Sequence, residues 1–126
     1  MSDFSKEFIK NQKIKLLEAK QKILDGFRKY DEETKSLGQE KPSEEGDLAQ
    51  VYLDQKLNIS FRERDMRTLR QIELALSKIE DKSYGYCEEY GEPIAQKRLE
   101  KQPWARLSLQ AAEDLEESQK HFRKVI

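Results

Sequence analysis

Cysteine, histidine and tryptophan each occur once in the 126 residues of this sequence. The single cysteine, Cys87, cannot form a disulfide within the chain. No uncharged apolar run approaches the roughly 20 residues that a membrane-spanning helix needs, and residues 1–7 lack the apolar core of a signal peptide. These absences predict a cytoplasmic protein with no membrane partner.

An excess of one charge sign is also missing, because 24 Lys and Arg residues stand against 25 Asp and Glu residues. A DNA-binding domain usually carries a basic excess on one face, so direct sequence-specific DNA binding is not expected. Charged residues make up 39% of the chain and hydrophobic residues 36%, compared with roughly 25% and 45–50% in typical globular proteins. The composition therefore excludes a compact domain with a deep core.

Glycine and proline, the residues that interrupt helices, are scarce in the first part of the chain. Residues 4–36 contain Gly26 and no proline. Apolar or aromatic residues recur there at every seventh position: Ile9, Leu16, Ile23 and Tyr30. This spacing predicts one long amphipathic helix.

A second uninterrupted stretch, from about residue 44 to residue 81, also predicts a long helix. Gly38 after Leu37 provides a helix stop, and Pro42 favours a turn. At about 1.5 Å per residue each helix spans roughly 50 Å. Because the connection is short, the two helices must return antiparallel as a coiled-coil hairpin.

From residue 83 the sequence changes character. Residues 83–94, here called the knuckle, contain two glycines, one proline and three tyrosines and predict a turn-rich segment. A last helix is predicted over about residues 109–123. The expected fold is all-α: a hairpin over residues 1–82 with an acidic tip around 37–49, and a small body over 83–126.

Catalytic motifs are missing from the sequence. It has no glycine-rich phosphate loop, no GxSxG and no HExxH pattern, and its lone His121 is expected at the surface of the last helix. No enzyme activity is predicted.

The knuckle resembles a known family. Residues 84–94 read YGYCEEYGEPI and are followed by KRLE at 97–100 and by Gln102-Pro103. This resembles the zinc-finger signature YGxCxxCGxxIxxxRLxxxP, followed by a second CxxC, of the DksA/TraR family of bacterial RNA polymerase-binding regulators. The resemblance extends from about residue 44 to the C-terminus, and the preceding helix fits the hairpin that the family implies.

The resemblance places the family's four zinc-binding cysteines at Cys87, Tyr90, Ser108 and Ala111, of which only the first is a cysteine. Structural zinc requires four ligands in a tetrahedral arrangement. We therefore expect a degenerate finger without metal and no other cofactor. Cys87 is then either a small packed residue or a reactive thiol.

The family's acidic tip motif DxxDxA falls on residues 44–49, where Glu44 replaces the first acid and Asp47 and Ala49 are retained. The resemblance implies that this tip enters the nucleotide-entry channel of RNA polymerase and modulates initiation. Considered alone, Asp47 followed by Gln50 also matches a helix N-cap box. Both roles are compatible, because a capped helix start presents its carboxylates rigidly.

The resemblance to the family also implies that one arginine of the second long helix docks onto the rim of the polymerase channel. Arg64 occupies that position, and Arg62 and Arg67 are close by on the same helix. Charges in such a run also fit a solvated helix face.

The residues that contact the alarmone ppGpp in the family are largely replaced. The corresponding positions are Gln71, Gln102 and Ala112, while Arg98 is retained as a possible remnant of that site. Fewer cations weaken phosphate recognition, which makes a response to ppGpp doubtful.

The function that the resemblance implies is a bacterial transcription regulator that binds RNA polymerase at the channel rim and the active-centre region. The alternative is a structural coiled-coil adaptor that binds another protein, since long charged helices often pair with helices. A transcript-cleavage factor of the Gre type shares the acidic hairpin tip, but the knuckle sequence disfavours it. Sensitivity of function to Asp47 distinguishes the regulator from the adaptor.

Overall fold

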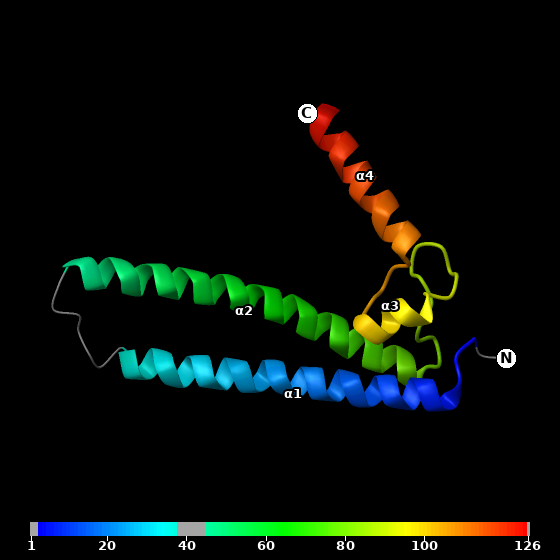
Figure 1. The fold of residues 1–126 in the computed structure, drawn as a ribbon, viewed down its shortest axis with the longest axis horizontal. Helices are drawn as coiled ribbons and strands as arrows, with labels where there is room; N and C mark the ends of the chain where they lie inside the picture. The colour runs from blue at the N-terminus through cyan, green and yellow to red at the C-terminus, as the bar shows by residue number, and fades with distance from the viewer. Residues whose placement is uncertain (1–2, 38–44, 126) are drawn as a thin grey trace. The chain divides into compact units, whose positions relative to one another are not determined.

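The computed structural model describes residues 3–37 and 45–125, with side chains described for 3–33 and 47–123. These residues form the helices α1 (Lys6–Leu37), α2 (Glu45–Glu80), α3 (Gln96–Lys101) and α4 (Leu109–Val125) (Figure 1). The described residues include no β-strand, only an isolated antiparallel bridge between Tyr86 and Pro93. No helix in this part of the chain combines the length and apolar character that a bilayer span requires.

The predicted all-α fold is confirmed, and α1, α2 and α4 begin and end within two residues of the expected positions. Ser5 fixes the start of α1, because the backbone N–H of Phe8 donates to its Oγ at 3.0 Å. The last described residue of α1 is Leu37, directly before the predicted stop at Gly38. The predicted turn at Pro42 lies outside the described residues.

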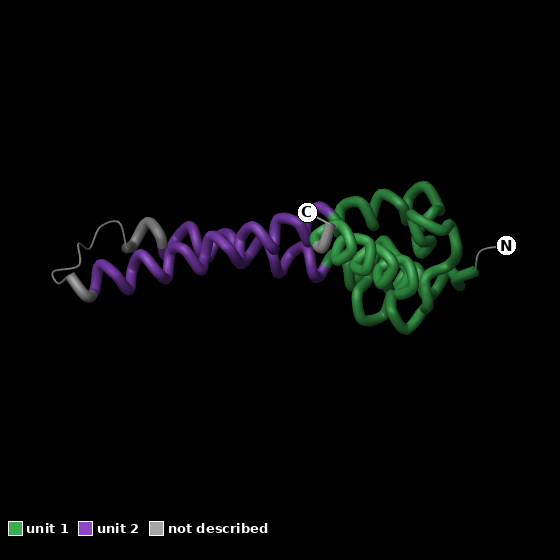
Figure 2. Tube along the Cα trace, turned by 90° about the horizontal axis from the view of Figure 1, so that it is seen from above, with its two compact units in different colours: residues 1–17, 71–126 green, residues 18–70 purple. Residues whose placement is uncertain are grey.

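The chain divides into two compact units, residues 1–17 with 71–126 (unit 1) and residues 18–70 (unit 2) (Figure 2). This differs from the predicted division at residue 82. The sequence pattern assigned the whole of both long helices to the hairpin, whereas the first turns of α1 and the last turns of α2 pack with the knuckle. Helical periodicity does not show where a helix exchanges one set of packing partners for another.

Unit 1 contains the buried core. Four of its apolar side chains are completely or almost completely buried, and they come from α1, α2, the knuckle and α3: Leu16, Ile72, Ile94 and Leu99. Helix α3 was not predicted, because six residues are too few to show a helical period. Its Leu99 supplies the contact that fixes the short helix to the core.

A polar cluster crosses this core. The buried amide of Gln12 donates to the hydroxyl of Tyr84 at 3.0 Å and to the carbonyl of Leu99 at 2.7 Å. The Tyr84 hydroxyl in turn donates to the carbonyl of Pro103 at 2.7 Å. Burial raises the pKa of Tyr84, and the hydrogen bond from Gln12 acts in the opposite direction. The cluster ties α1 to the knuckle and to the segments around α3.

The segment before α1 packs on the knuckle through aromatic rings. Phe4 is buried, with its ring centroid 5.5 Å from that of Phe8 and 6.0 Å from that of Tyr86. Gly85 has a positive φ of 96°, and a Cβ at this position would overlap the Phe4 ring. The glycine predicted to mark a turn is therefore required twice, for its backbone conformation and for the space beside it.

Unit 2 consists of the second part of α1 and the first part of α2, two antiparallel helices joined through residues 38–44 (Figure 1). None of the side chains described in this unit is fully buried. Its apolar seam is thin, so individual contacts across it matter more than they would in a deep core.

Candidate functional site

The tip of unit 2 presents an acid on the first turn of α2. Helix α2 begins at Glu45, and both Asp47 and Ala49 are exposed. A carboxylate in a first turn is favoured by the partial positive charge at the helix N-terminus. Glu44, the other predicted tip acid, lies outside the described residues. The arrangement can present a negative charge to cationic groups of a partner.

The capping-box interpretation of Asp47 is wrong. The helix already begins two residues before Asp47, and the amide of Gln50 donates to Asp54 at 2.9 Å. A capping box would have required Gln50 to reach back to the backbone N–H of Asp47. Gln50 therefore bonds to Asp54, its i,i+4 neighbour on the helix surface, and does not form the capping box.

Exposed apolar side chains follow the tip along α2, and the sequence pattern did not single them out as site residues. They occur as two i,i+4 pairs: Leu48 with Tyr52, and Leu53 with Leu57. Each is more than half exposed, and Tyr52 is 64% exposed. Their spacing was a possible signal for a contact surface beside the acid.

The side chain of Arg62 contacts the facing helix, α1. Its Nη1 lies 2.8 Å from Oδ1 of Asp31, and its guanidinium stacks 4.9 Å from the ring centroid of Phe27 and 5.6 Å from that of Tyr30. Three side chains of α1 thus hold one side chain of α2. Part of what the sequence pattern assigned to docking serves to join the two helices.

The other two predicted docking arginines occupy different places. The guanidinium of Arg64 lies 5.3 Å from the ring of Phe61 on its own helix. Arg67 instead lines a shallow groove of about 420 Å³ on α2, here called the arginine groove. The residues of this groove share one helix face: Ile59, Arg62, Glu63, Met66, Arg67 and Arg70.

Arg70 was missed by the sequence prediction. Its spacing of three residues from Arg67 and four from Met66 was the available signal, because such spacings place side chains on one helix face. The structure therefore brings together Arg62, Arg67 and Arg70, while Arg64 is not among the residues that line the groove. This surface combines two apolar side chains, three arginines and one acid, Glu63.

The four positions considered for ppGpp lie in unit 1 and line one cavity of about 440 Å³: Gln71, Arg98, Gln102 and Ala112. Nε of Arg98 donates to the carbonyl of Leu107 at 3.0 Å. A second arginine of this cavity, Arg106, is paired with Glu88. Both cations are thus partly committed to other groups, which reduces the positive charge offered to a phosphate.

Glu88 links three segments of unit 1. Its carboxylate accepts from Nζ of Lys78 at 2.7 Å and from Nη2 of Arg106 at 2.6 Å. The hydrogen bond from Arg106, opposed by partial burial and reinforced by Lys78, lowers the pKa of Glu88 to about 2. No sequence motif marks this cluster, because its members are brought together by the fold alone.

The positions of the family's zinc ligands lie between the knuckle and the start of α4. Cys87 and Ala111 are buried, with 2% and 3% of their surface exposed. Together the four side chains offer one thiol, one phenol, one hydroxyl and one methyl group. This donor set does not fit a tetrahedral zinc ion. Within the described residues, no three His, Cys, Asp or Glu side chains gather in an arrangement that could hold a metal.

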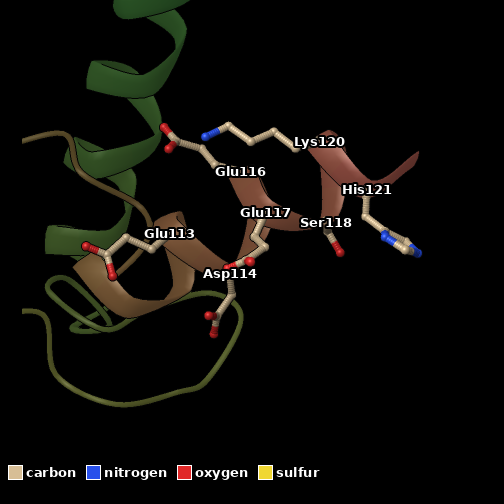
Figure 3. A pocket seen from close by; sticks show the side chains of 7 residues that line it. All are labelled: Glu113, Asp114, Glu116, Glu117, Ser118, Lys120 and His121. Atoms are coloured by element: carbon tan, nitrogen blue, oxygen red, sulfur yellow. The ribbon is translucent and has the colours of Figure 1, made fainter. Parts of the chain in front are cut away.

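Helix α4 carries an acidic exposed face (Figure 3). Glu113, Glu116 and Glu117 lie on this face together with Lys120 and His121. His121 points away from the helix, as the sequence pattern predicted. This arrangement is that of a solvated helix surface.

Comparison with known proteins identifies the family. Residues 82–117 match the family model described as the prokaryotic dksA/traR C4-type zinc finger. The RNA polymerase-binding transcription factor DksA of Caulobacter vibrioides is 38% identical over 126 residues, which cover 98% of this chain and 84% of that protein. An uncharacterized protein of Aquifex aeolicus is 38% identical over 114 residues, covering 89% of this chain and 79% of that one.

Solved structures show the same fold. The structure of transcription factor DksA2 from Pseudomonas aeruginosa matches with a TM-score of 0.79 and 29% identity, covering 93% of this chain and 89% of that chain. The RNA polymerase-binding protein and transcriptional regulator Dks from Chlamydia trachomatis matches with a TM-score of 0.57 and 27% identity, covering 91% and 94%. The resemblance in the knuckle is confirmed, and the chain belongs to the DksA/TraR family.

Proposed function

We propose that this chain is a bacterial transcription regulator that binds RNA polymerase and places its acidic tip in the nucleotide-entry channel. The observation that supports this most strongly is 38% identity, across 98% of this chain, to a DksA protein named as an RNA polymerase-binding transcription factor. The exposed carboxylate of Asp47 on the first turn of α2 provides the chemistry of the tip.

Two packed helices suit entry into a narrow channel. Each helix with its side chains is roughly 10–12 Å across. At the tip, Asp47 would bring a negative charge close to the cationic side chains and the magnesium ion of a polymerase active centre. A charge brought into such a partly desolvated site interacts more strongly than it does in bulk water.

Regulation requires a difference in affinity between states of the partner. The tip can shift a promoter-complex equilibrium only if it binds one polymerase state more tightly than another. A difference of about 1–3 kcal/mol changes the populations by about 5–150-fold. A single hydrogen bond to a charged group contributes about 1.5–3 kcal/mol, which is of this size.

The arginine groove is the proposed docking surface at the channel rim. Arg67 and Arg70 offer guanidinium groups beside the apolar side chains of Ile59 and Met66. This combination suits a helical partner surface that carries acidic and apolar residues. Arg64 is a second proposed contact outside the groove, and Arg62, which also lines the groove, is held in place by its contacts with α1.

A strong response to ppGpp is not part of the proposal. The cavity in unit 1 contains Gln71, Gln102 and Ala112 where the family offers cations, and Arg98 is already bonded to the backbone. The chain is proposed to act on polymerase largely without the alarmone.

The test is an in vitro transcription assay with bacterial RNA polymerase and the variant Asp47→Asn, which removes the charge and preserves the shape. We expect unchanged polymerase binding and loss of the effect on initiation. Asp54→Asn is the matched control, because Asp54 is also an exposed acid of α2. Unchanged regulation by Asp47→Asn would instead favour a coiled-coil adaptor.

A further inference from the structure

A hydrogen bond between the knuckle and α4, a cap at the start of α4 and a buried methyl group lie at or next to the positions where the family has its zinc ligands. Ser108 stands at the N-terminal end of α4, and its Oγ accepts from the backbone N–H of Ala111 at 3.2 Å. The hydroxyl of Tyr90 donates to the carboxylate of Asp114, one turn into the same helix. The methyl group of Ala111 is buried against this junction.

The sulfur of Cys87 receives hydrogen bonds from both sides of the junction. Burial raises the pKa of the Cys87 thiol, but bonds from the backbone and hydroxyl of Ser108 and from the backbone of Tyr90 and Glu89 outweigh it. The net effect is a lowered pKa. The sulfur thus contacts the knuckle through Tyr90 and Glu89, and the start of α4 through Ser108.

The knuckle itself is closed by its own backbone. Cys87 N–H donates to the carbonyl of Glu92 at 2.7 Å, and Ile94 N–H donates to the carbonyl of Gly85 at 2.7 Å. Glu88 adds a hydrogen bond from its N–H to the carbonyl of Arg106 at 3.0 Å. None of these contacts requires a metal ion.

We infer that Cys87, Tyr90, Ser108 and Ala111 form a metal-independent fastening between the knuckle and α4, so that this chain folds without zinc. A zinc ion in a C4 finger joins two pairs of ligands that are distant in sequence. Here the same two segments are joined by the Cys87–Ser108 and Tyr90–Asp114 contacts and by the packing of Ala111. The inference does not depend on what the protein binds.

The first test measures metal content and chelator sensitivity of the full chain purified in the presence of zinc. We expect no stoichiometric zinc and the same melting temperature with and without a strong chelator. One zinc ion per chain, or a melting temperature that falls when chelator is added, would overturn the inference.

The second test restores the ligands. The triple variant Tyr90→Cys, Ser108→Cys and Ala111→Cys places four thiols at the family's positions, and we expect it to bind one zinc ion per chain and to become sensitive to chelator. A matched control carries Tyr90→Cys, Ser108→Cys and Gln119→Cys, with the same number of thiols and one placed at an exposed position of α4, and should not bind zinc stoichiometrically. A triple variant that also fails to bind zinc would overturn the inference, because the four positions would then not lie close enough together to act as one fastening.

The third test examines the fastening itself through Ser108→Ala. Loss of a helix cap alone would increase hydrogen exchange only in the first turn of α4. We expect exchange to increase in residues 87–91 of the knuckle as well, because the bond to the Cys87 sulfur is lost. Gln119→Ala, at an exposed position of α4, is the control and should leave both regions unchanged. Exchange that rises in α4 alone would contradict the inference.

Discussion

Arg62 and Asp31 form an ion pair across the two helices of unit 2, with 2.8 Å between Nη1 and Oδ1. The same guanidinium stacks on Phe27 and Tyr30 of α1. No described side chain of unit 2 is fully buried, so this contact joins its helices without the support of a deep core. Within unit 2, Arg62 thus joins the helix that carries Asp47 and the arginine groove to the facing part of α1.

The first prediction concerns this contact. Arg62→Gln removes an exposed ion pair, worth about 0.2–1 kcal/mol, and cation–π contacts of about 0.5–1 kcal/mol each. We expect faster hydrogen exchange in residues 18–33 and 47–70. Arg62→Lys should have an intermediate effect, since it keeps the charge but loses the planar stack. Arg64→Gln is the control. Equal increases in hydrogen exchange for Arg62→Gln and Arg64→Gln would contradict a specific role of Arg62 in joining the two helices.

The arginine groove gives the second prediction. Arg67→Ala combined with Arg70→Ala should weaken polymerase binding about tenfold or more, because each charge-assisted hydrogen bond contributes about 1.5–3 kcal/mol and about 1.4 kcal/mol is a factor of ten. The loss should decrease at high salt. Lys56→Ala, an exposed cation on the same helix, serves as control in a titration against labelled polymerase. A salt-independent loss, or none, would remove the groove from the docking surface.

Three glycines give a graded stability prediction. Gly85→Ala should be the most destabilising, by more than about 2 kcal/mol, because its φ is positive and the Phe4 ring occupies the space of a Cβ. Gly91→Ala has a positive φ but open space and should cost about 1 kcal/mol. Gly26→Ala, inside α1 with nothing nearby, should stabilise by about 0.5–1 kcal/mol. Denaturant unfolding measures this order, and any other order would contradict it.

Glu88 predicts a dependence of stability on pH. Its pKa in the folded chain is lowered to about 2 from the ordinary value of 4.5, so folding favours the ionised form. The stabilisation is complete above pH 4.5 and is lost as the pH falls through about 2. At neutral pH, Glu88→Gln should cost about 1 kcal/mol, a value reduced by solvent screening of this partly exposed cluster.

The measurement is acid unfolding of the wild type and of Glu88→Gln. Their difference in stability should be constant near neutral pH and should shrink toward zero below about pH 2. Glu89→Gln, the exposed neighbour, should follow the wild type. A difference between the wild type and Glu88→Gln that persists unchanged at the lowest pH would show that packing, not charge, explains the effect.

The long helices could be predicted because their cause is local. Heptad spacing in α1, and the near absence of glycine and proline in both α1 and α2, are sufficient to predict these helices. The turn-rich knuckle could also be predicted from the sequence, because its glycines mark turns locally. Gly85, for example, adopts a positive φ that favours glycine. Zinc absence remains a prediction that rests on the residue types at the four ligand positions.

What could not be predicted depends on partners far apart in the sequence. Arg62 meets Asp31 only because α1 and α2 pack side by side with these two positions opposite each other, and no local sequence pattern determines that alignment. Glu88 meets Lys78 and Arg106 for the same reason. The capping box failed because Gln50 found Asp54 on its own helix face. Local motifs identify candidates, and tertiary contacts decide among them.

The most direct test of the proposed function is site-specific crosslinking from Ala49, which is exposed two residues after Asp47 near the start of α2. A photoreactive residue at this position, in the complex of the full chain with bacterial RNA polymerase, should crosslink to the polymerase segments that line the nucleotide-entry channel near the active centre. A complex that forms normally but crosslinks only to the outer surface of the polymerase would contradict the proposal.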